Sequence, residues 1–323
     1  MTSLAVLTSG GDAPGMNAAL RAVVRAGVAR GIDVFGVRHG YTGLIAGDFS
    51  RMGPRDVGGI IGRGGTVLGT TRCVRLKTDE GQAAACEQMR SHAVDGLIVI
   101  GGNGSQAGAY ALSRRGMRVV GIASTIDNDL VGADTSLGST TALDVALEAI
   151  DRLRVTAASH NRVFLVEVMG RDSGHLALVA GIAGGAEAIV LPEVEVHPET
   201  IADEICGAYE RGKSHAIVVV AEGAQYNAEG LLRYFREHSE RLGFEPRVSA
   251  LGHTQRGGTP GVTDRMIGTR LGASAIEHLD GDRHGIMLGM IDGKVAATAL
   301  SAVVGRRKPL DSRLLDLATM LTR

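Results

Sequence analysis

The feature that most restricts the fold of this chain is a recurring pattern of short apolar runs, each followed by a glycine-rich or polar turn and a helix-like stretch. The pattern occurs in "SLAVLTSGG", "DGLIVIGGNG", "RVVGIAST", "NRVFLVEVMG" and "HAIVVVAEG". Continuous Val, Ile and Leu runs that alternate with helices are typical of parallel strands buried on both faces. We therefore predict an α/β fold built of doubly wound domains with mainly parallel sheets.

The length and glycine content agree with this architecture. A chain of 323 residues is long enough for two domains of ordinary size. A helical stretch at residues 140–160 lies between two groups of predicted strands, and we place the crossover between domains there. The 47 glycines follow no repeat, which excludes a collagen-like chain and leaves many tight loops as their explanation.

Charge and cysteine content exclude several classes of protein. Lys and Arg number 34 against 35 Asp and Glu, so no basic excess predicts binding to nucleic acid or to a membrane. The three cysteines include no Cys-x-x-Cys pair, which argues against a disulfide framework or a zinc site. The N-terminal apolar run is short and broken by glycine, so we expect neither a signal peptide nor a membrane span, and a cytoplasmic location.

Two glycine-rich turns, "TSGGDAPG" and "GGNGS", are candidates for phosphate binding because ligands gather at the carboxyl ends of parallel strands. In the first turn, Asp12 is placed where an N-cap could lie and Pro14 is near the first helical position, so the helix that follows offers a seat for an anion. Neither turn matches the Walker A or dinucleotide fingerprint. Each alone is consistent with an ordinary turn, but together they favour a phosphate ligand.

The segment "STIDND" carries the most specific chemistry. If it is extended, Thr125, Asp127 and Asp129 point the same way. Two neighbouring carboxylates raise the pKa of at least one of them, as a general base for a hydroxyl requires. A capping or Asx-turn cluster is the alternative, and the residues alone do not decide between the two.

A group of cationic residues follows or precedes the later strands, where guanidinium groups could neutralise phosphate charge. A single arginine is usually a solvated surface residue, but several on glycine-bearing strand ends favour a binding site. Glu222 ends one apolar run and could accept hydrogen bonds from sugar hydroxyls. The cationic candidates are Arg162, Arg171, Arg247, His253 and Arg256.

Taken together, these segments resemble the bacterial ATP-dependent 6-phosphofructokinases (phosphofructokinase A type). The motifs that carry the resemblance match in order along nearly the whole chain: "LTSGGDAPGMNA", "IGRGGT", "TIDND", "EAIDRLR", "EVMGR", "IAGGAE" and "LGHTQRGG". The resemblance implies a cytoplasmic homotetramer that transfers the ATP γ-phosphoryl group to the 1-hydroxyl of fructose 6-phosphate, with Mg²⁺, in glycolysis. It implies a nucleotide-binding domain at residues 1–138 plus about 255–306, and a sugar-phosphate-binding domain at about 139–254 plus 307–323.

The resemblance also implies roles for individual residues. Asp127 resembles the family's base, with Thr125 and Asp129 beside it, while Arg171 and the Gly11 backbone would stabilise the transferring group. Arg162 and Arg247 would reach the sugar phosphate of a neighbouring subunit. The residues implied for ATP are Gly11, Arg72, Cys73, Gly102, Asn103, Gly104 and Ser105. Those implied for the sugar phosphate are Thr125, Ile126, Asp127, Arg162, Met169, Gly170, Arg171, Glu222, Arg247, His253 and Arg256.

A third set of residues matches the family's effector positions. Arg21 and Arg25 lie one helical turn apart, a spacing that alone usually marks a solvated helix face. The resemblance instead implies a site for ADP or phosphoenolpyruvate between subunits. The matching residues are Arg21, Arg25, Arg154, Gly185, Glu187, Arg211, Lys213 and His215.

The chain departs from the family at several positions. Asn103 stands where the family usually has an aspartate that helps to hold Mg²⁺, so we expect weakened metal affinity. Ser124 replaces the glycine of ATP-using members. Pyrophosphate-using members have an aspartate at the position of Gly104 and a lysine at the position of Ser124, so this chain carries neither mark of pyrophosphate use. Ser139 and Thr140 replace two aromatic residues. These changes, with Cys73, leave two alternatives: a weakly active or regulatory paralogue, or a kinase of another sugar phosphate.

Overall fold

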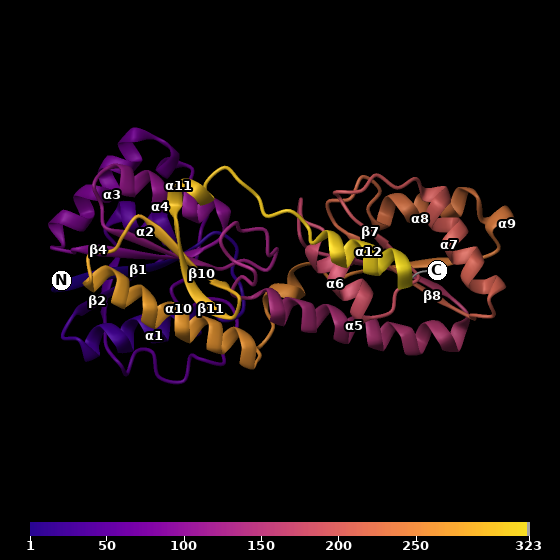
Figure 1. The fold of residues 1–323 in the computed structure, drawn as a ribbon, viewed down its shortest axis with the longest axis horizontal. Coiled ribbons are helices and arrows are strands. Elements are labelled where there is room, and N and C mark those ends of the chain that lie inside the picture. The colour runs from indigo at the N-terminus through magenta and orange to yellow at the C-terminus, as the bar shows by residue number, and fades with distance from the viewer. Residues whose placement is uncertain (322–323) are drawn as a thin grey trace. The chain divides into compact units, whose positions relative to one another are not determined.

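The computed structural model describes residues 1–321, which form two compact units (Figure 1). The first unit comprises Met1–Thr141 and Arg256–Lys308, and the second comprises Ala142–Gln255 and the C-terminal segment from Pro309. The boundary near the middle of the chain falls inside helix α5 (Ser139–His160). The predicted second domain ends at residue 323, and its last two positions lie outside the described residues.

The first unit is built on a seven-stranded sheet with the order β11-β10-β5-β4-β1-β2-β3. The central strands run parallel, and only the edge pairs β2–β3 and β10–β11 are antiparallel. The predicted α/β class with mainly parallel sheets is therefore confirmed. The strands are β1 (Ser3–Ser9), β2 (Asp33–Val37), β3 (Phe49–Met52), β4 (Gly96–Gly101), β5 (Val119–Ala123), β10 (Ile286–Ile291) and β11 (Lys294–Ala299).

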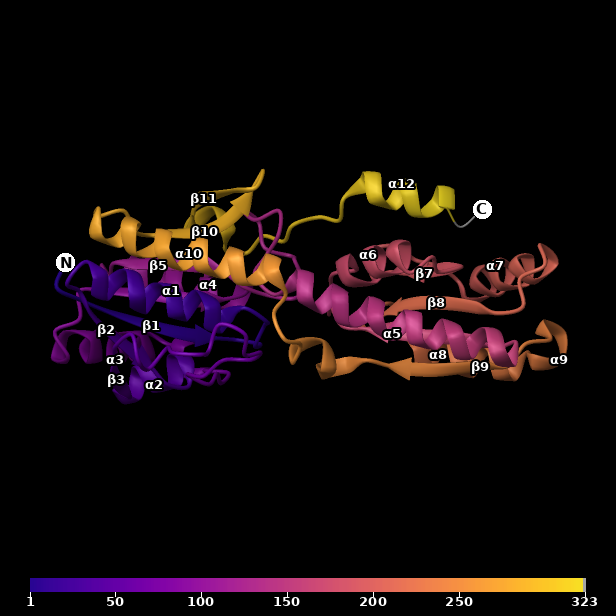
Figure 2. The same cartoon turned by 90° about the horizontal axis from the view of Figure 1, so that it is seen from below.

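Helices cover both faces of this sheet (Figures 1 and 2). On one face α1 (Met16–Ala29) packs along α10 (Val262–Asp280). The other face is covered by α2 (Gly40–Ala46), α3 (Asp79–Ser91), α4 (Asn103–Arg114) and α11 (Leu300–Val303), with the short 3₁₀ helix η1 (Arg75–Lys77) beside them.

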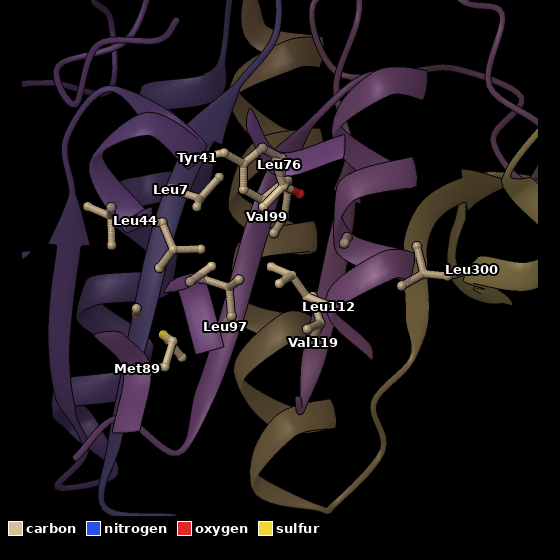
Figure 3. Packing of buried hydrophobic residues seen from close by; sticks show 14 of the residues in the cluster. Leu7, Tyr41, Leu44, Leu76, Met89, Leu97, Val99, Leu112, Val119 and Leu300 are labelled. Atoms are coloured by element: carbon tan, nitrogen blue, oxygen red, sulfur yellow. The ribbon is translucent and has the colours of Figure 1, made fainter. Parts of the chain in front are cut away.

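Alternation along the strands explains why both faces need cover. Leu7, Leu97 and Val99 point toward α2, α3 and α4, where they meet Leu44, Met89 and Leu112 (Figure 3). The intervening side chains Val6, Ile98 and Ile100 are also fully buried. Apolar residues at every strand position thus bury both faces, as expected for a parallel sheet between two helix layers.

The second unit contains a four-stranded parallel sheet with the order β7-β8-β6-β9. Its strands are β6 (Val163–Val168), β7 (Ala188–Val190), β8 (Ala216–Ala221) and β9 (Pro246–Ala250). Helices α7 (Pro198–Glu210) and α8 (Ala228–Glu237) share a core with one face, and α9 (Ser239–Leu242) extends that layer. Helix α6 (His175–Ala183) contacts β6, β7 and β8 and carries the C-terminal helix α12 (Ser312–Leu321).

The start of α1 differs from the prediction. The helix begins at Met16, after Gly15 as N-cap in the left-handed conformation (φ 95°), and no side chain caps it. Asp12 is therefore not the cap, and Pro14 precedes the helix. A Cβ at Gly15 would lie 2.6 Å from Leu137 Cδ1, so both the conformation and the tight packing require glycine. Among residues 1–321, no helix combines the length and apolar character needed to span a bilayer.

Candidate active site and family

The first unit brings three predicted segments together at the carboxyl ends of adjacent strands. Strands β1, β4 and β5 are neighbours, with Ser9 paired to Gly101 and Gly101 paired to Ala123. The turn at Gly10 and Gly11, the turn from Gly102 to Ser105 and the segment from Ser124 to Asp129 follow these three strands directly. Register in a parallel sheet therefore brings together three segments that are separated in the chain.

Close backbone approach explains the glycines in these turns. A Cβ on Gly101 would lie 2.5 Å from both Ser9 O and Ser105 Oγ. A Cβ on Gly11 would lie 2.6 Å from Nη1 of Arg256. The same Arg256 nitrogen donates to Asp12 O at 2.9 Å. Arg256, predicted to hold the sugar phosphate, thus places its positive charge against the Gly11–Asp12 turn.

The "STIDND" segment bends after β5, so the structure decides against the extended conformation that the sequence left open beside an Asx-turn cluster. Strand β5 ends at Ala123, and Asn128 adopts the left-handed conformation (φ 50°). The Asn128 side chain donates to Asp134 O at 3.0 Å, and its Oδ1 accepts from Ser136 N–H at 2.9 Å. An asparagine that bonds locally tolerates this conformation, so the loop turns where a simple alternation pattern continues straight.

Asp127 and Asp129 lie half-buried in this loop, whereas Thr125 and Ile126 are buried. Asp127 N–H donates to Thr125 Oγ1 at 3.2 Å. The Asn103 amide nitrogen, at the start of α4, donates to Asp129 Oδ2 at 2.8 Å. This hydrogen bond joins two of the three predicted segments through side chains.

The oxygens in this region suit a hard divalent ion. Two carboxylates, Asp127 and Asp129, and the Asn103 amide belong to one edge of the sheet, and Mg²⁺ is usually held by one or two carboxylates plus substrate phosphates. Within residues 1–321, no group of three or more His, Cys, Asp or Glu side chains could hold a metal. The residues fit an ion that depends on a bound nucleotide for the rest of its ligands.

The predicted nucleotide-binding residues Arg72 and Cys73 come just after Thr70, which is hydrogen-bonded to the Gly10–Gly11 turn. Thr70 Oγ1 donates to Gly10 O at 2.8 Å. Tyr41, a residue not predicted from the sequence, donates a hydrogen bond from its buried hydroxyl to Ser105 O at 2.6 Å and so anchors the first turn of α4. Burial, and then the charge of Cys73, raise the pKa of Tyr41. Gly104, in the same first turn, has open space where a Cβ would be.

In the second unit, Met169, Gly170 and Arg171 follow the carboxyl end of β6, and Glu222 follows that of β8. Arg171 N–H donates to Glu222 Oε1 at 3.0 Å. Gln255, another residue not predicted, accepts the Met169 N–H through Oε1 at 2.7 Å. His253 lies beyond the carboxyl end of β9, in the 3₁₀ helix η2 (Gly252–Arg256). These strand ends collect most of the second unit's predicted sugar-phosphate residues.

Arg162 and Arg247 lie at the other end of the same sheet. Arg162 directly precedes β6, and Arg247 is the second residue of β9, paired with Phe164. Six strand residues separate Arg162 from Met169, which corresponds to roughly 20 Å at the usual rise per residue. Within this one chain, the sheet does not bring the two arginines to the strand ends that carry Arg171 and Glu222. Arg247 instead forms an ion pair with Glu245 at 2.8 Å.

Several predicted effector residues of the second unit already have partners. Glu187, which is 4% exposed, accepts from Lys213 Nζ at 2.8 Å and from Ile217 N–H at 2.6 Å. Arg154 donates to Gly185 O at 2.9 Å. Arg211 and His215 flank this group in the chain, between α7 and β8. Arg21 and Arg25 belong to α1 of the first unit.

The chain is similar to known proteins along nearly its whole length. The family model described as phosphofructokinase matches residues 3–279. The chain is 50% identical over 323 residues to ATP-dependent 6-phosphofructokinase 1 of Thermus thermophilus, covering 99% of each protein. It is 44% identical over 322 residues to ATP-dependent 6-phosphofructokinase of Listeria monocytogenes, covering 100% of each protein.

Among solved structures, the chain is similar to Pichia pastoris phosphofructokinase in the T-state. The TM-score is 0.88 and the identity 34%; the match covers 99% of this chain but spans only 36% of that longer chain. Because the family model covers most of the sequence and the two bacterial relatives match it from end to end, the chain belongs to the phosphofructokinase family.

Proposed function

We propose that this protein is an ATP-dependent 6-phosphofructokinase that phosphorylates fructose 6-phosphate at its 1-hydroxyl and acts in glycolysis. The names of the full-length relatives from Thermus thermophilus and Listeria monocytogenes support this reaction. Because ATP and a sugar phosphate are its substrates, we also place the enzyme in the cytoplasm.

The observation that carries the proposal is the meeting of two glycine turns and the Asp127–Asp129 loop at the ends of β1, β4 and β5. The glycine turns present backbone N–H groups and the start of α4, which suit phosphate oxygens. The loop supplies carboxylates for the acceptor. We therefore assign nucleotide binding to the first unit and sugar-phosphate binding to Met169–Arg171, Glu222 and His253 of the second.

Phosphoryl transfer requires positioning and charge neutralisation more than covalent chemistry by the protein. The acceptor oxygen bonds to the γ-phosphorus while the bond from that phosphorus to the β,γ-bridging oxygen breaks and ADP leaves. Asp127 accepts the proton of the sugar hydroxyl. The Gly11 N–H and the Arg171 guanidinium neutralise charge on the transferring group. Arg256, held against the Gly11–Asp12 turn by its bond to Asp12 O, adds positive charge beside that turn.

Magnesium is the cofactor that we propose. Asp129 would hold it together with the nucleotide phosphates, and the ion would neutralise phosphate charge, while Asp127 stays available to accept the hydroxyl proton. Asn103 donates its amide N–H to Asp129 Oδ2, so its contribution is orientation of that carboxylate, with no negative charge of its own. This arrangement supports function with a weaker metal affinity than an aspartate at position 103 would give.

The separation of Arg162 and Arg247 from Arg171 within the sheet supports a homo-oligomer. We propose a homotetramer in which Arg162 and Arg247 hold the 6-phosphate of a sugar bound to a neighbouring subunit. The effector residues would bind ADP or phosphoenolpyruvate between subunits in the same assembly.

Turnover of the purified full-length protein with ATP and with pyrophosphate, each with fructose 6-phosphate over a Mg²⁺ series, tests the donor and the reaction. We expect faster turnover with ATP, because Gly104 leaves open space and the buried Ser124, bonded to Leu137 O at 3.2 Å, offers no cation for pyrophosphate. Faster turnover with pyrophosphate would overturn the assignment. Replacing fructose 6-phosphate by other sugar phosphates tests the acceptor.

One structural feature favours a second candidate function, that of a weakly active or regulatory paralogue. The Asn103 amide donates a hydrogen bond to Oδ2 of Asp129, and this oxygen is one that the metal ion of a bound nucleotide would otherwise contact. Activity that stays negligible at high Mg²⁺ with every acceptor would favour this candidate over the enzyme.

A further inference from the structure

The loop from Thr125 to Ser136 carries the proposed base, Asp127, and the proposed metal ligand, Asp129, and hydrogen bonds hold its shape. Asn128 closes it from within through Asp134 O and Ser136 N–H. Ser136 Oγ donates to Thr125 O at 2.7 Å. The edge of the sheet adds two anchors, since Asp134 N–H donates to Met290 O at 2.7 Å and Asp134 Oδ2 accepts from Asp292 N–H at 2.8 Å.

A residue far away in the chain contributes three more hydrogen bonds to this loop. Lys308 is the last residue of the first unit and is partly buried. Its backbone N–H donates to Asp129 O at 2.9 Å. Its ammonium donates to Ala133 O at 2.9 Å and to Asp134 O at 2.6 Å. The loop carbonyls on either side of the turn are thus held by one side chain and its own backbone.

The ammonium is suited to this role because its three N–H donors can serve two carbonyls at once, and charge-assisted hydrogen bonds are stronger than neutral ones. Burial lowers the pKa of Lys308, and the charges of Asp134 and Asp129 act in the opposite direction. The contact of Lys308 with Asp129 is the backbone hydrogen bond from its N–H to Asp129 O.

We propose that Lys308 is a positioning residue for phosphoryl transfer, which fixes the loop so that Asp127 and Asp129 hold their working geometry. This inference rests on the proposed phosphofructokinase function. Lys308 itself touches carbonyl groups of the loop and would act on the reaction through Asp127 and Asp129. Since catalytic groups must be placed to within a fraction of an ångström, loss of the ammonium should reduce the chemical step more than substrate binding.

The test compares Lys308→Met, Lys308→Arg and the control Lys294→Met in the full-length protein. Methionine preserves the length of the side chain and leaves the backbone bond to Asp129, so this variant isolates the ammonium. We expect kcat to fall about 10- to 100-fold for Lys308→Met, with KM for fructose 6-phosphate within about twofold of the parent. Lys308→Arg, which keeps a cationic donor, should restore most of kcat. Lys294, exposed on β11, should be neutral.

Amide hydrogen exchange provides a readout that does not depend on activity. In Lys308→Met, the amides of residues 125–136 should exchange faster than in the parent, while those of β8 in the second unit should not change. If the parent is active, a Lys308→Met variant with the same kcat as the parent would overturn the inference. Loop amides that exchange as slowly in this variant as in the parent would also overturn it. A loss of kcat accompanied by faster amide exchange throughout the first unit would overturn it too, because Lys308 would then support only the stability of the fold.

If the parent shows no activity with ATP and fructose 6-phosphate, the proposed function fails by itself. Faster exchange in Lys308→Met that is confined to residues 125–136 would then still show that Lys308 stabilises this loop. Unchanged exchange would exclude that role. The two failures are therefore distinguishable.

Discussion

The Asn103 amide nitrogen donates a hydrogen bond of 2.8 Å to Oδ2 of Asp129, and this contact links the start of α4 to the loop after β5. An aspartate at position 103 could not donate this bond, and its charge would lie at contact distance from Asp129. The asparagine therefore gives the Asp129 carboxylate a hydrogen-bond donor in the absence of a metal ion. Two carboxylates at this distance would repel each other and would need a cation between them.

Replacing Asn103 by aspartate should make the enzyme more responsive to Mg²⁺. We expect Asn103→Asp to lower the Mg²⁺ concentration for half-maximal rate and to make ATP affinity more dependent on Mg²⁺, because the added charge attracts the ion and repels free ATP. Initial rates over a Mg²⁺ titration at saturating substrates measure this.

The control for that change is Asn103→Ala, which removes the hydrogen bond to Asp129 and adds no charge. It should not lower the Mg²⁺ requirement. Superimposable Mg²⁺ curves for the parent and Asn103→Asp would show that position 103 has no part in managing the ion.

Removing the proposed base should slow the reaction without weakening sugar binding. Asp127→Asn keeps the size of the side chain but cannot accept the hydroxyl proton, so kcat should fall roughly 10²- to 10⁴-fold. KM for fructose 6-phosphate should stay close to the parent value. Steady-state kinetics at saturating Mg²⁺ check this, and a variant that keeps at least half of the parent kcat would exclude Asp127 as the base.

Tyr41 should support ATP binding through its bond to Ser105 O. Tyr41→Phe removes that bond, so the free energy of unfolding should fall by about 1 kcal/mol and KM for ATP should rise, with KM for the sugar unchanged. Denaturant unfolding and kinetics measure the two effects. Tyr110→Phe, on α4, is the matched control, and equal effects of both substitutions would contradict a specific role for Tyr41.

Tyr41 also predicts a dependence on alkaline pH. Because burial raises its pKa in the folded state, the stability it contributes is complete below the unfolded value of 10.0 and is lost as the pH rises above it. The free energy of unfolding should therefore decline less steeply above that pH in Tyr41→Phe than in the parent.

The second unit should lose a stabilising contact in acid. Glu199 accepts from Nη1 and Nη2 of Arg241 at 2.6 and 2.7 Å and from the Tyr234 hydroxyl at 2.6 Å. The bonds from Arg241 and then from Tyr234 lower the pKa of Glu199 from 4.5 to about 2. The stability it contributes is present above pH 4.5 and is lost as the pH falls toward 2.

Glu199→Gln should therefore flatten the loss of stability in this acid range, as measured by thermal unfolding between the two pH values. The control is Glu229→Gln, in the first turn of α8 and exposed. An acid limb that is equally steep in Glu199→Gln and in the parent would contradict the assignment.

The proposed effector site can be tested on one helix. Arg154→Ala should weaken the response of the enzyme to ADP and to phosphoenolpyruvate, because it removes a cation beside Gly185. Arg152→Ala, two residues earlier on α5, removes an exposed arginine that forms an ion pair with Glu148 and should leave the response unchanged. If Arg154→Ala and Arg21→Ala both respond like the parent, these arginines do not bind the effector.

Much of the architecture could be predicted from local pattern. Uninterrupted apolar runs such as "GLIVI" can be buried only when both faces of a strand are covered, so the α/β class and the positions of β1, β4, β5, β6 and β8 follow from the sequence. The glycines after these strands marked where the backbone approaches other segments. The family motifs then implied roles that spacing alone left open, such as the role of base proposed for Asp127.

Local pattern failed where contacts between distant segments determine the conformation. The alternation of Thr125, Asp127 and Asp129 left open whether "STIDND" is extended or bent, and the bonds of Asn128 to Asp134 and Ser136 decide for the bend. The sequence likewise carried no signal that Asn103 donates to Asp129, or that Lys308 reaches the same loop from near the other end of the chain. Strand periodicity is a property of neighbours in sequence, whereas these hydrogen bonds exist only after the sheet has brought β4, β5 and residue 308 together.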